Sequence, residues 1–368
     1  MSSLPPSVRE PVYYAPYLQL ERLLDCQSLE SKKYGPAAHD EMLFIITHQA
    51  YELWFKQILH ELQSVIEVFQ QAAVPEKDMG TVIHRLARIK TIQRLLLMQI
   101  DVIETMTPLD FLEFRNLLVP ASGFQSVQFK QIEIMLGLRR SQRTAEDQGF
   151  FRTRLTADEQ AVLTALEATP SLFDLTDYWL SRMPFLKFGE FDFWKHYGQA
   201  VERMLEADKQ IIQQNTAISD SHRRAQLDVL DVTRTKLGAI LDEHEYNCMR
   251  ANNEVRLQHS AFLAALFIHL YRDEPMMYLP FRYLTLLVEI DGQMTTWRAR
   301  HALMVQRMLG TKIGTGGSSG HEYLVKTTDR NRVYLDLYNL STFLLPRSAL
   351  PPLPEALTRA MSFHRSTG

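Results

Sequence analysis

The chain contains 368 residues, of which 46% are hydrophobic and 23% are charged, so it is long enough to bury a large core. Its net charge of −3, from 40 Lys and Arg residues against 43 Asp and Glu residues, excludes a bulk attraction to nucleic acid or to an anionic membrane. Two distant cysteines, Cys26 and Cys248, exclude a disulfide scaffold and favour a cytoplasmic location, and no apolar run reaches the roughly 18–20 residues that span a bilayer. Only 15 residues are Gly, and long segments rich in Leu, Glu, Gln, Arg and Met predict an all-α fold.

The N-terminal arm, residues 1–17, is rich in Pro and Ser at its start and in Tyr at its end. Tyr14 and Tyr17 precede a short helix that we expect at residues 18–24. An arm of this composition packs either on a neighbouring subunit or on its own core, and the residues leave both readings open.

Residues 37–71 contain neither Gly nor Pro and predict one long helix. The first half of this segment is apolar on nearly every side, which is typical of a buried helix. His48 lies in the middle of the apolar run, one turn after Phe44 on the same face. A histidine there is either a packed core residue or part of a site.

A second long helix is expected at residues 79–106, and Thr107, followed by Pro, has the position of a helix N-cap. The short helix that it opens carries Phe111, Arg115 and Leu118 on one face. An arginine in an apolar stripe either snorkels or meets a core carboxylate, or it grips the carboxylate or phosphate of a ligand with two parallel hydrogen bonds.

The sequence divides into a core that is interrupted once. Residues 1–189 predict the first part of a helical core and residues 254–368 its second part. The polar, charged segment between them, residues 190–253, predicts a helical hairpin inserted into that core. Within the first part, Ser122 and Gln125 form a predicted capping box that opens a helix ending at Gly137, and residues 139–155 are expected to form a surface loop.

The second part of the core has another long helix at residues 280–309, in which His301 and Trp297 share an apolar stripe. The stretch that follows, 310–320, is the glycine-rich part of the chain. It fits a loop that closes over a small ligand, with a plain linker as the alternative, and it lacks the Gly-Lys-Ser/Thr pattern of a nucleotide-binding loop. An apolar tail, 333–345, is expected to be helical.

His48 and His301 have no His or Cys three or four positions away, so the usual zinc patterns are absent. A single histidine on an aromatic- and Met-lined helix suits a haem iron, which needs only one or two protein ligands and a large apolar slot.

Four segments carry a family resemblance: THQAYELWFKQILHEL, DFLEFRNLLVPASGFQS, WRARHALMVQRMLG and GTGGSSG. In this order, and over nearly the whole chain, they resemble the tryptophan 2,3-dioxygenase family. The resemblance implies a helical-bundle core that encloses a b-type haem, with a small helical insertion. It also implies a homotetramer, a dimer of dimers, in which the arm tyrosines Tyr14 and Tyr17 reach the site of a neighbouring subunit. The family usually has Tyr-Gly-x-Tyr there, whereas this chain has Tyr-Ala-Pro-Tyr.

The activity that the resemblance implies is the opening of the indole pyrrole ring of L-tryptophan by O2 at ferrous haem. The product is N-formyl-L-kynurenine, formed in the first step of tryptophan catabolism by the kynurenine route. Two alternatives stay open. One is a relative that oxygenates a substituted tryptophan or indole, with insertion of a single oxygen atom, and the other is a haem-binding sensor without turnover.

The resemblance also assigns roles around the haem. His301 corresponds to the axial ligand of the iron, with Trp297 beside it. His48 corresponds to the catalytic histidine that accepts a hydrogen bond from the indole N–H. Ser122 corresponds to a small residue lining the pocket, and Lys130 stands near a haem propionate, where relatives often have Arg.

Around the substrate, Phe44 and Leu118 correspond to apolar walls of the indole pocket, and Phe111 stands where some members have Tyr. Arg115 corresponds to the residue that pairs with the substrate carboxylate. Thr315 corresponds to the loop residue that, with a haem propionate, holds the substrate ammonium group.

Overall fold

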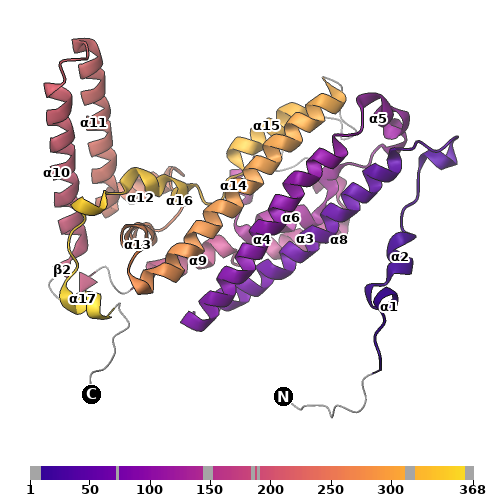
Figure 1. Cartoon of the computed structure of the whole chain (residues 1–368), viewed down its shortest axis with the longest axis horizontal. Coiled ribbons are helices and arrows are strands. Elements are labelled where there is room, and N and C mark those ends of the chain that lie inside the picture. Colours follow the sequence, from indigo (N-terminus) through magenta and orange to yellow (C-terminus); the bar gives the residue numbers. More distant parts are fainter. Residues whose placement is uncertain are drawn as a thin grey trace.

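The computed structural model describes residues 10–71, 74–143, 152–183, 187–188, 191–310 and 320–360, and its regular structure is almost entirely helical (Figure 1). The α-helices are α1 (Tyr14–Leu18), α2 (Leu20–Leu24), α3 (Glu41–Phe69), α4 (Glu76–Ile103), α5 (Pro108–Arg115), α6 (Val127–Leu136), α8 (Ala157–Glu167), α9 (Leu172–Ser181), α10 (Phe193–Gln214), α11 (Asp220–Leu241), α12 (Glu243–Ala251), α13 (His259–Leu270), α14 (Pro275–Leu309), α15 (Gly320–Arg330), α16 (Leu335–Asn339) and α17 (Glu355–Ala360). Two short strands, β1 (Lys187–Phe188) and β2 (Phe191–Asp192), pair antiparallel. The all-α fold expected from the composition is confirmed.

Three long helices, α3, α4 and α14, form the centre of the bundle, and α4 packs against both of the others (Figure 1). Their contacting faces are apolar at helical spacing, and Leu62, Leu86 and Leu287, one from each helix, are fully buried. Burial of each such side chain stabilises the fold by about 1.5–3 kcal/mol. α15 packs along α14 and α6 packs along α3, so the bundle brings segments distant in sequence to one place.

The long helices differ from expectation mainly at their starts. α3 begins at Glu41, four residues later than predicted, because the buried Glu41 carboxylate accepts hydrogen bonds from the backbone N–H groups of Glu30 (2.7 Å) and Ser31 (3.0 Å) and holds the preceding loop outside the helix. α14 begins at Pro275 rather than at residue 280. Pro275 occupies the first turn, and Pro280 in the second turn removes a single backbone hydrogen bond from a 35-residue helix.

The expected helix start at Ser122 is wrong. The capping box is present, with the Ser122 N–H donating to Gln125 Oε1 at 2.9 Å, but it closes only one 3-10 turn, η4 (Gly123–Gln125). The α-helix starts one turn later, where Ser126 Oγ accepts from the Phe129 N–H at 3.2 Å. The two N-caps, Ser122 and Ser126, lie four residues apart. Gly123 follows the first, whereas the second is followed by residues that favour a helix.

Two other expectations need correction. The helix predicted at 18–24 starts at Leu20 as α2, because Gln19 has a positive φ of 52°, and a second short helix, α1, precedes it in the segment that was expected to be an arm. The apolar tail forms the short helix α16 followed by the 3-10 helix η8 (Leu340–Phe343). The start of α15, next to the glycine-rich stretch, was not expected from the sequence.

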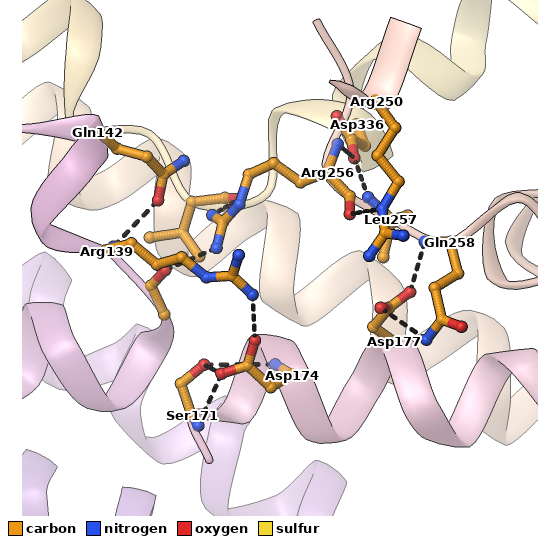
Figure 2. A network of polar contacts seen from close by, with 12 residues as sticks. Arg139, Gln142, Ser171, Asp174, Asp177, Arg250, Arg256, Leu257, Gln258 and Asp336 are labelled. Carbon is orange, nitrogen blue, oxygen red and sulfur yellow. Dashed lines mark hydrogen bonds and ion pairs between the residues drawn. The ribbon is translucent and has the colours of Figure 1, made fainter. Parts of the chain in front are cut away.

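Helices α10 and α11 form a hairpin that stands at one end of the molecule (Figure 1). It occupies the segment for which the sequence predicts an insertion, and the division of the chain at residues 190 and 253 stays a prediction. The chain that returns from the hairpin is held to the core by a polar network, shown in Figure 2. Arg256 donates to the carbonyl oxygens of Gly137 at 2.8 Å and Val333 at 3.0 Å, and Asp336 accepts from the N–H groups of Arg256 and Leu257, each at 2.7 Å.

The N-terminal arm lies apart from the bundle, with α1 and α2 at the other side of the molecule from the hairpin (Figure 1). Tyr14 and Tyr17 are 74% and 73% exposed in this single chain. Across the described part of the chain, each helix is too short or too polar to cross a membrane.

Candidate functional site

A cavity of about 260 Å³ lies between the long helices α3, α4 and α14 on one side and α5, α6, α15 and the segments that follow α5 and α15 on the other. Aromatic and aliphatic side chains make up most of its wall, with two histidines and a small group of charged and polar side chains. The residues that line it are Phe44, His48, Tyr51, Glu52, Phe55, Ile100, Ile103, Met106, Phe111, Ser122, Gly123, Phe124, Ser126, Phe129, Lys130, Glu133, Trp297, Arg298, His301, Met304, Val305, Met308, Leu309, Leu324, Thr327 and Asn331.

His48 enters the cavity from α3. Its Nδ1 is 2.7 Å from the carbonyl oxygen of Phe44, one turn earlier, so Nδ1 carries a proton and donates it to that carbonyl. The removal of water around the ring lowers the pKa of His48, and this outweighs the Phe44 hydrogen bond and the charge of Glu52, which act in the opposite direction. At neutral pH the ring is therefore uncharged, and its Nε2 lone pair is available as a hydrogen-bond acceptor.

His301 enters the same cavity from α14. Burial, with a smaller contribution from His48, lowers the pKa of His301 to about 4, so the ring is neutral at physiological pH. Its Nδ1 is buried and has no hydrogen-bond partner among the residues that the structure describes. The Trp297 ring stacks against the imidazole with a centroid distance of 4.9 Å and an angle of 6° between the planes. The arrangement fixes the plane of a ring whose nitrogen lone pair can bind a metal.

An aromatic cluster closes one end of the cavity. The Phe44 and Phe111 rings stack at a centroid distance of 5.6 Å, and the buried Phe114 packs edge-on against both of them. Leu118 packs on this cluster without lining the cavity. Arg115 lies at the C-terminal end of α5, one turn after Phe111, and is half-buried outside the lining residues.

The position of α5 follows from its start, as the sequence predicts. The Asp110 N–H donates to Thr107 Oγ1 at 3.3 Å, and the Thr107 N–H donates to Asp110 Oδ2 at 2.9 Å, so two otherwise unpaired donors of the helix end are satisfied. The predicted N-cap at Thr107 is confirmed, and Asp110 completes it as a capping box, which sets the start of the helix that carries Phe111 and Arg115.

The wall formed by α6 holds a buried charged group that sequence reasoning missed. The Glu133 carboxylate is 2.7 Å from Arg298 Nη2, 2.6 Å from Arg143 Nη1 and 3.3 Å from Lys130 Nζ. Burial alone raises the pKa of Glu133, but the three cations outweigh it and hold this pKa well below its usual range. Arg143 was expected in a surface loop, and its burial at 3% exposure corrects that expectation for the described end of the 139–155 segment.

A weak signal for this group was present in the sequence. Glu133 interrupts the apolar run from Ile132 to Leu136, and Arg298 directly follows Trp297. Charged residues in apolar surroundings require partners. The sequence cannot say which partners these are, because Glu133 and Arg298 are separated by 165 positions.

The structure brings together seven of the predicted site residues at the cavity: Phe44, His48, Phe111, Ser122, Lys130, Trp297 and His301. Four others lie elsewhere. Leu118 packs behind the aromatic wall, Arg115 lies at the end of α5 outside the lining residues, and Tyr14 and Tyr17 lie on the arm, apart from the cavity in this single chain. Thr315 and the rest of the glycine-rich stretch from 311 to 319 lie outside the described residues.

The side chains at the cavity can be compared with those that a metal ion or a haem would require. Over the described ranges, no three His, Cys, Asp or Glu side chains lie together as a protein-only metal site would require. The cavity instead has the neutral imidazole of His301, apolar walls, and Lys130, paired with Glu133, among its lining residues. This combination fits a planar, largely apolar metal cofactor with carboxylate groups, which is the chemistry of haem.

The fold and the cavity thus define a class: all-α proteins in which two histidines from different helices face one apolar internal pocket. The comparisons with known proteins identify the family. The family described as tryptophan 2,3-dioxygenase matches residues 7–344, and the chain belongs to it. The family membership inferred from the sequence is confirmed.

Proteins named tryptophan 2,3-dioxygenase from distant organisms are similar to the chain along its length. The protein from Alteromonas mediterranea is 54% identical and aligns over 96% of this chain and 98% of its own. That from Bdellovibrio bacteriovorus is 48% identical over 96% and 99%, and that from Dictyostelium discoideum is 46% identical over 97% and 90%.

Proposed function

We propose that this protein is a haem-dependent dioxygenase that converts L-tryptophan and O2 to N-formyl-L-kynurenine. The proposal rests on one observation above all: two neutral histidines, His48 and His301, share an apolar cavity in a chain of the tryptophan 2,3-dioxygenase family. The reaction breaks the C2–C3 bond of the indole, and both oxygen atoms of O2 enter the product, so that no reductant is consumed.

In this proposal His301 holds haem b, and the cofactor in its ferrous state supplies the O2 chemistry. The neutral imidazole of His301 at the cavity and the apolar wall around it support this role. Trp297, stacked on the imidazole, keeps the ring plane fixed. Lys130 would face the carboxylates of the cofactor, and Ser122 would border the pocket.

His48 is proposed to orient the substrate. The Phe44 carbonyl holds the proton on Nδ1, so Nε2 can accept a hydrogen bond from the indole N–H. An indole N–H is a very weak acid, and the lowered pKa of His48 makes the ring a poor base. The role of His48 is therefore that of an acceptor that positions the ring for reaction.

The remaining substrate contacts follow the family pattern. Phe44 and Phe111 would contact the indole, with Leu118 packed behind them. Arg115 would pair with the α-carboxylate and Thr315 with the α-ammonium group. Arg115 lies one helical turn after Phe111 on α5, the helix that contributes Phe111 to the cavity wall, and this position supports its role at the substrate end of the pocket.

We also propose that the protein works as a homotetramer, a dimer of dimers, in the cytoplasm. Large apolar side chains exposed on the single chain support the assembly, among them Tyr14 and Tyr17 of the arm, Leu53 of α3 and Met98 of α4. The two free, exposed cysteines are compatible with a reducing compartment.

The proposed function is tested by product mass. Reduced, haem-loaded protein is mixed with L-tryptophan and ¹⁸O2, and the product is expected to carry two labelled oxygen atoms. A single labelled atom would indicate monooxygenation, and no product would contradict catalysis. His301→Ala should yield folded protein without a Soret band, whereas full Soret absorbance in that variant would refute the role of His301 in holding the haem.

A further inference from the structure

Glu133 of α6 is hydrogen-bonded to Arg298 of α14, the helix that carries His301. Glu133 Oε1 accepts a hydrogen bond from Arg298 Nη2 at 2.7 Å, and Arg298 Nη1 donates to the Asn331 carbonyl at 2.8 Å. Glu133 and Arg298 are only 2% and 4% exposed. Their contact is a charge-assisted hydrogen bond in a buried setting, where such bonds are strong and directional.

Arg298 lies on the same turn of α14 as Trp297 and His301. Arg298 directly follows Trp297 and precedes His301 by three residues, so the three side chains stand on adjoining parts of one helical turn. Rotation of α14 about its axis would move all three together. A fixed Arg298 therefore fixes the direction in which the imidazole of His301 and its stacked partner enter the cavity.

Glu133 is itself held from several sides. Glu133 Oε2 lies 2.6 Å from Arg143 Nη1. The backbone carbonyl of Glu133 accepts hydrogen bonds from the N–H groups of Gly137 at 3.2 Å and Leu138 at 2.9 Å, at the end of α6. The carbonyl oxygen of Gly137 in turn accepts a hydrogen bond from Arg256 at 2.8 Å, and Arg256 belongs to the polar network described above. The acceptor end of the Glu133–Arg298 contact is thus anchored to α6 and to the chain that returns from the hairpin.

We propose that Glu133 is a positioning residue, which acts through Arg298 to set the rotation of α14 and so the orientation of the His301 imidazole toward the cofactor. The proposal rests on the proposed function of His301 as the haem ligand. Glu133 touches neither substrate nor reacting atoms in this role. The structure also supplies a matched comparison, since α14 carries a second arginine, Arg300, on the other side of the same turn.

The side chain of Arg300 is 41% exposed and pairs with Asp101 of α4 at 2.8 Å and with Glu104, at the end of α4, at 3.2 Å. The ion pairs of Arg298 and Arg300 both link α14 to a neighbouring helix, and each lies within three residues of His301. They differ in burial and in direction, because only Arg298 faces the cavity. Loss of the exposed pair should leave the imidazole where it is.

The experiment compares Glu133→Gln, Arg298→Met and Arg300→Met as haem-loaded proteins. Arg298→Met leaves Glu133 paired with Arg143 and Lys130, so it keeps the test open if Glu133→Gln does not fold. The readouts are the iron–imidazole stretching band in the resonance Raman spectrum of the ferrous protein and the rate of haem transfer to an excess of apomyoglobin. For Glu133→Gln and Arg298→Met we expect a shifted or broadened band, haem loss at least about tenfold faster, and a fall in kcat that exceeds any change in KM.

The Arg300→Met variant is expected to match the wild type in both readouts. The proposal is overturned if folded Glu133→Gln or Arg298→Met shows the wild-type band and a haem transfer rate within about twofold of the wild type. It is also overturned if Arg300→Met changes both readouts to the same extent. Failure of the wild-type protein to bind haem would instead refute the proposed function, so the two failures are distinguishable.

Discussion

Gly137, at the end of α6, offers a prediction whose size can be worked from the structure. Its φ of +122° is a backbone conformation that L-residues rarely adopt, and a Cβ added there would lie 2.4 Å from the Phe173 Cβ. A strained backbone costs about 1–3 kcal/mol, and overpacking against a buried ring costs about 1–3 kcal/mol more. Gly137→Ala should therefore lower the free energy of unfolding by about 2–6 kcal/mol, a large part of the roughly 5–15 kcal/mol that stabilises a typical protein.

The assay is urea unfolding followed by circular dichroism, with Gly80→Ala as the matched control. Gly80 lies within α4, and an added Cβ there meets nothing within 4 Å. Because Ala is the better helix former, this control should be more stable than the wild type by about 0.5–1 kcal/mol. Equal unfolding midpoints for Gly137→Ala and the wild type would refute the steric reasoning, as would an equal loss of stability in the control.

Three further predictions concern the site and its pH dependence. Arg115→Leu should raise the KM for L-tryptophan roughly 10- to 150-fold, the equivalent of about 1.5–3 kcal/mol for a lost charge-assisted contact, and steady-state kinetics with an unchanged KM would contradict the carboxylate role. His48→Ala should lower kcat while the Soret band is retained, and loss of the band would mean that His48 holds the cofactor. Without cofactor, the protein should lose stability as the pH falls from about 6.5 toward 4, because His301 has an ordinary pKa of 6.5 and a folded pKa of about 4, so the unfolded chain binds the proton first. Urea midpoints at several pH values measure this slope, which should be smaller in His301→Leu; equal slopes in the two proteins would show that other groups control the acid transition.

Much of the helical architecture could be predicted from local sequence. The apolar pattern of residues 37–71, which contain neither Gly nor Pro, and of residues 79–106 predicted α3 and α4 to within about one turn, and the Thr107 N-cap followed by Pro predicted the start of α5. These predictions succeed because helix formation and capping depend on residues three to four positions apart. The prediction at Ser122 was wrong because two N-caps, Ser122 and Ser126, follow one another, and capping patterns alone do not say which of the two starts the α-helix.

Some residues of the candidate site could likewise be identified from the sequence, whereas the contacts between distant residues could not. The sequence marked His48 and His301 as unusual because each is an ionisable residue in an apolar helical stripe, and the family resemblance assigned roles to them and to Trp297. It did not reveal the Glu133–Arg298 contact or the contribution of α15 to the wall, since these depend on how α6, α14 and α15 pack.

The sequence by itself therefore determined the helices, the apolar faces and the family of this protein, because these properties are encoded in short spacings and in matching segments. Only the tertiary structure decided which of the ionisable residues share one cavity and which buried charges pair. The physical reason is that a buried carboxylate must find cations in space, wherever the packing of helices brings them, and sequence separation sets no limit on where they come from.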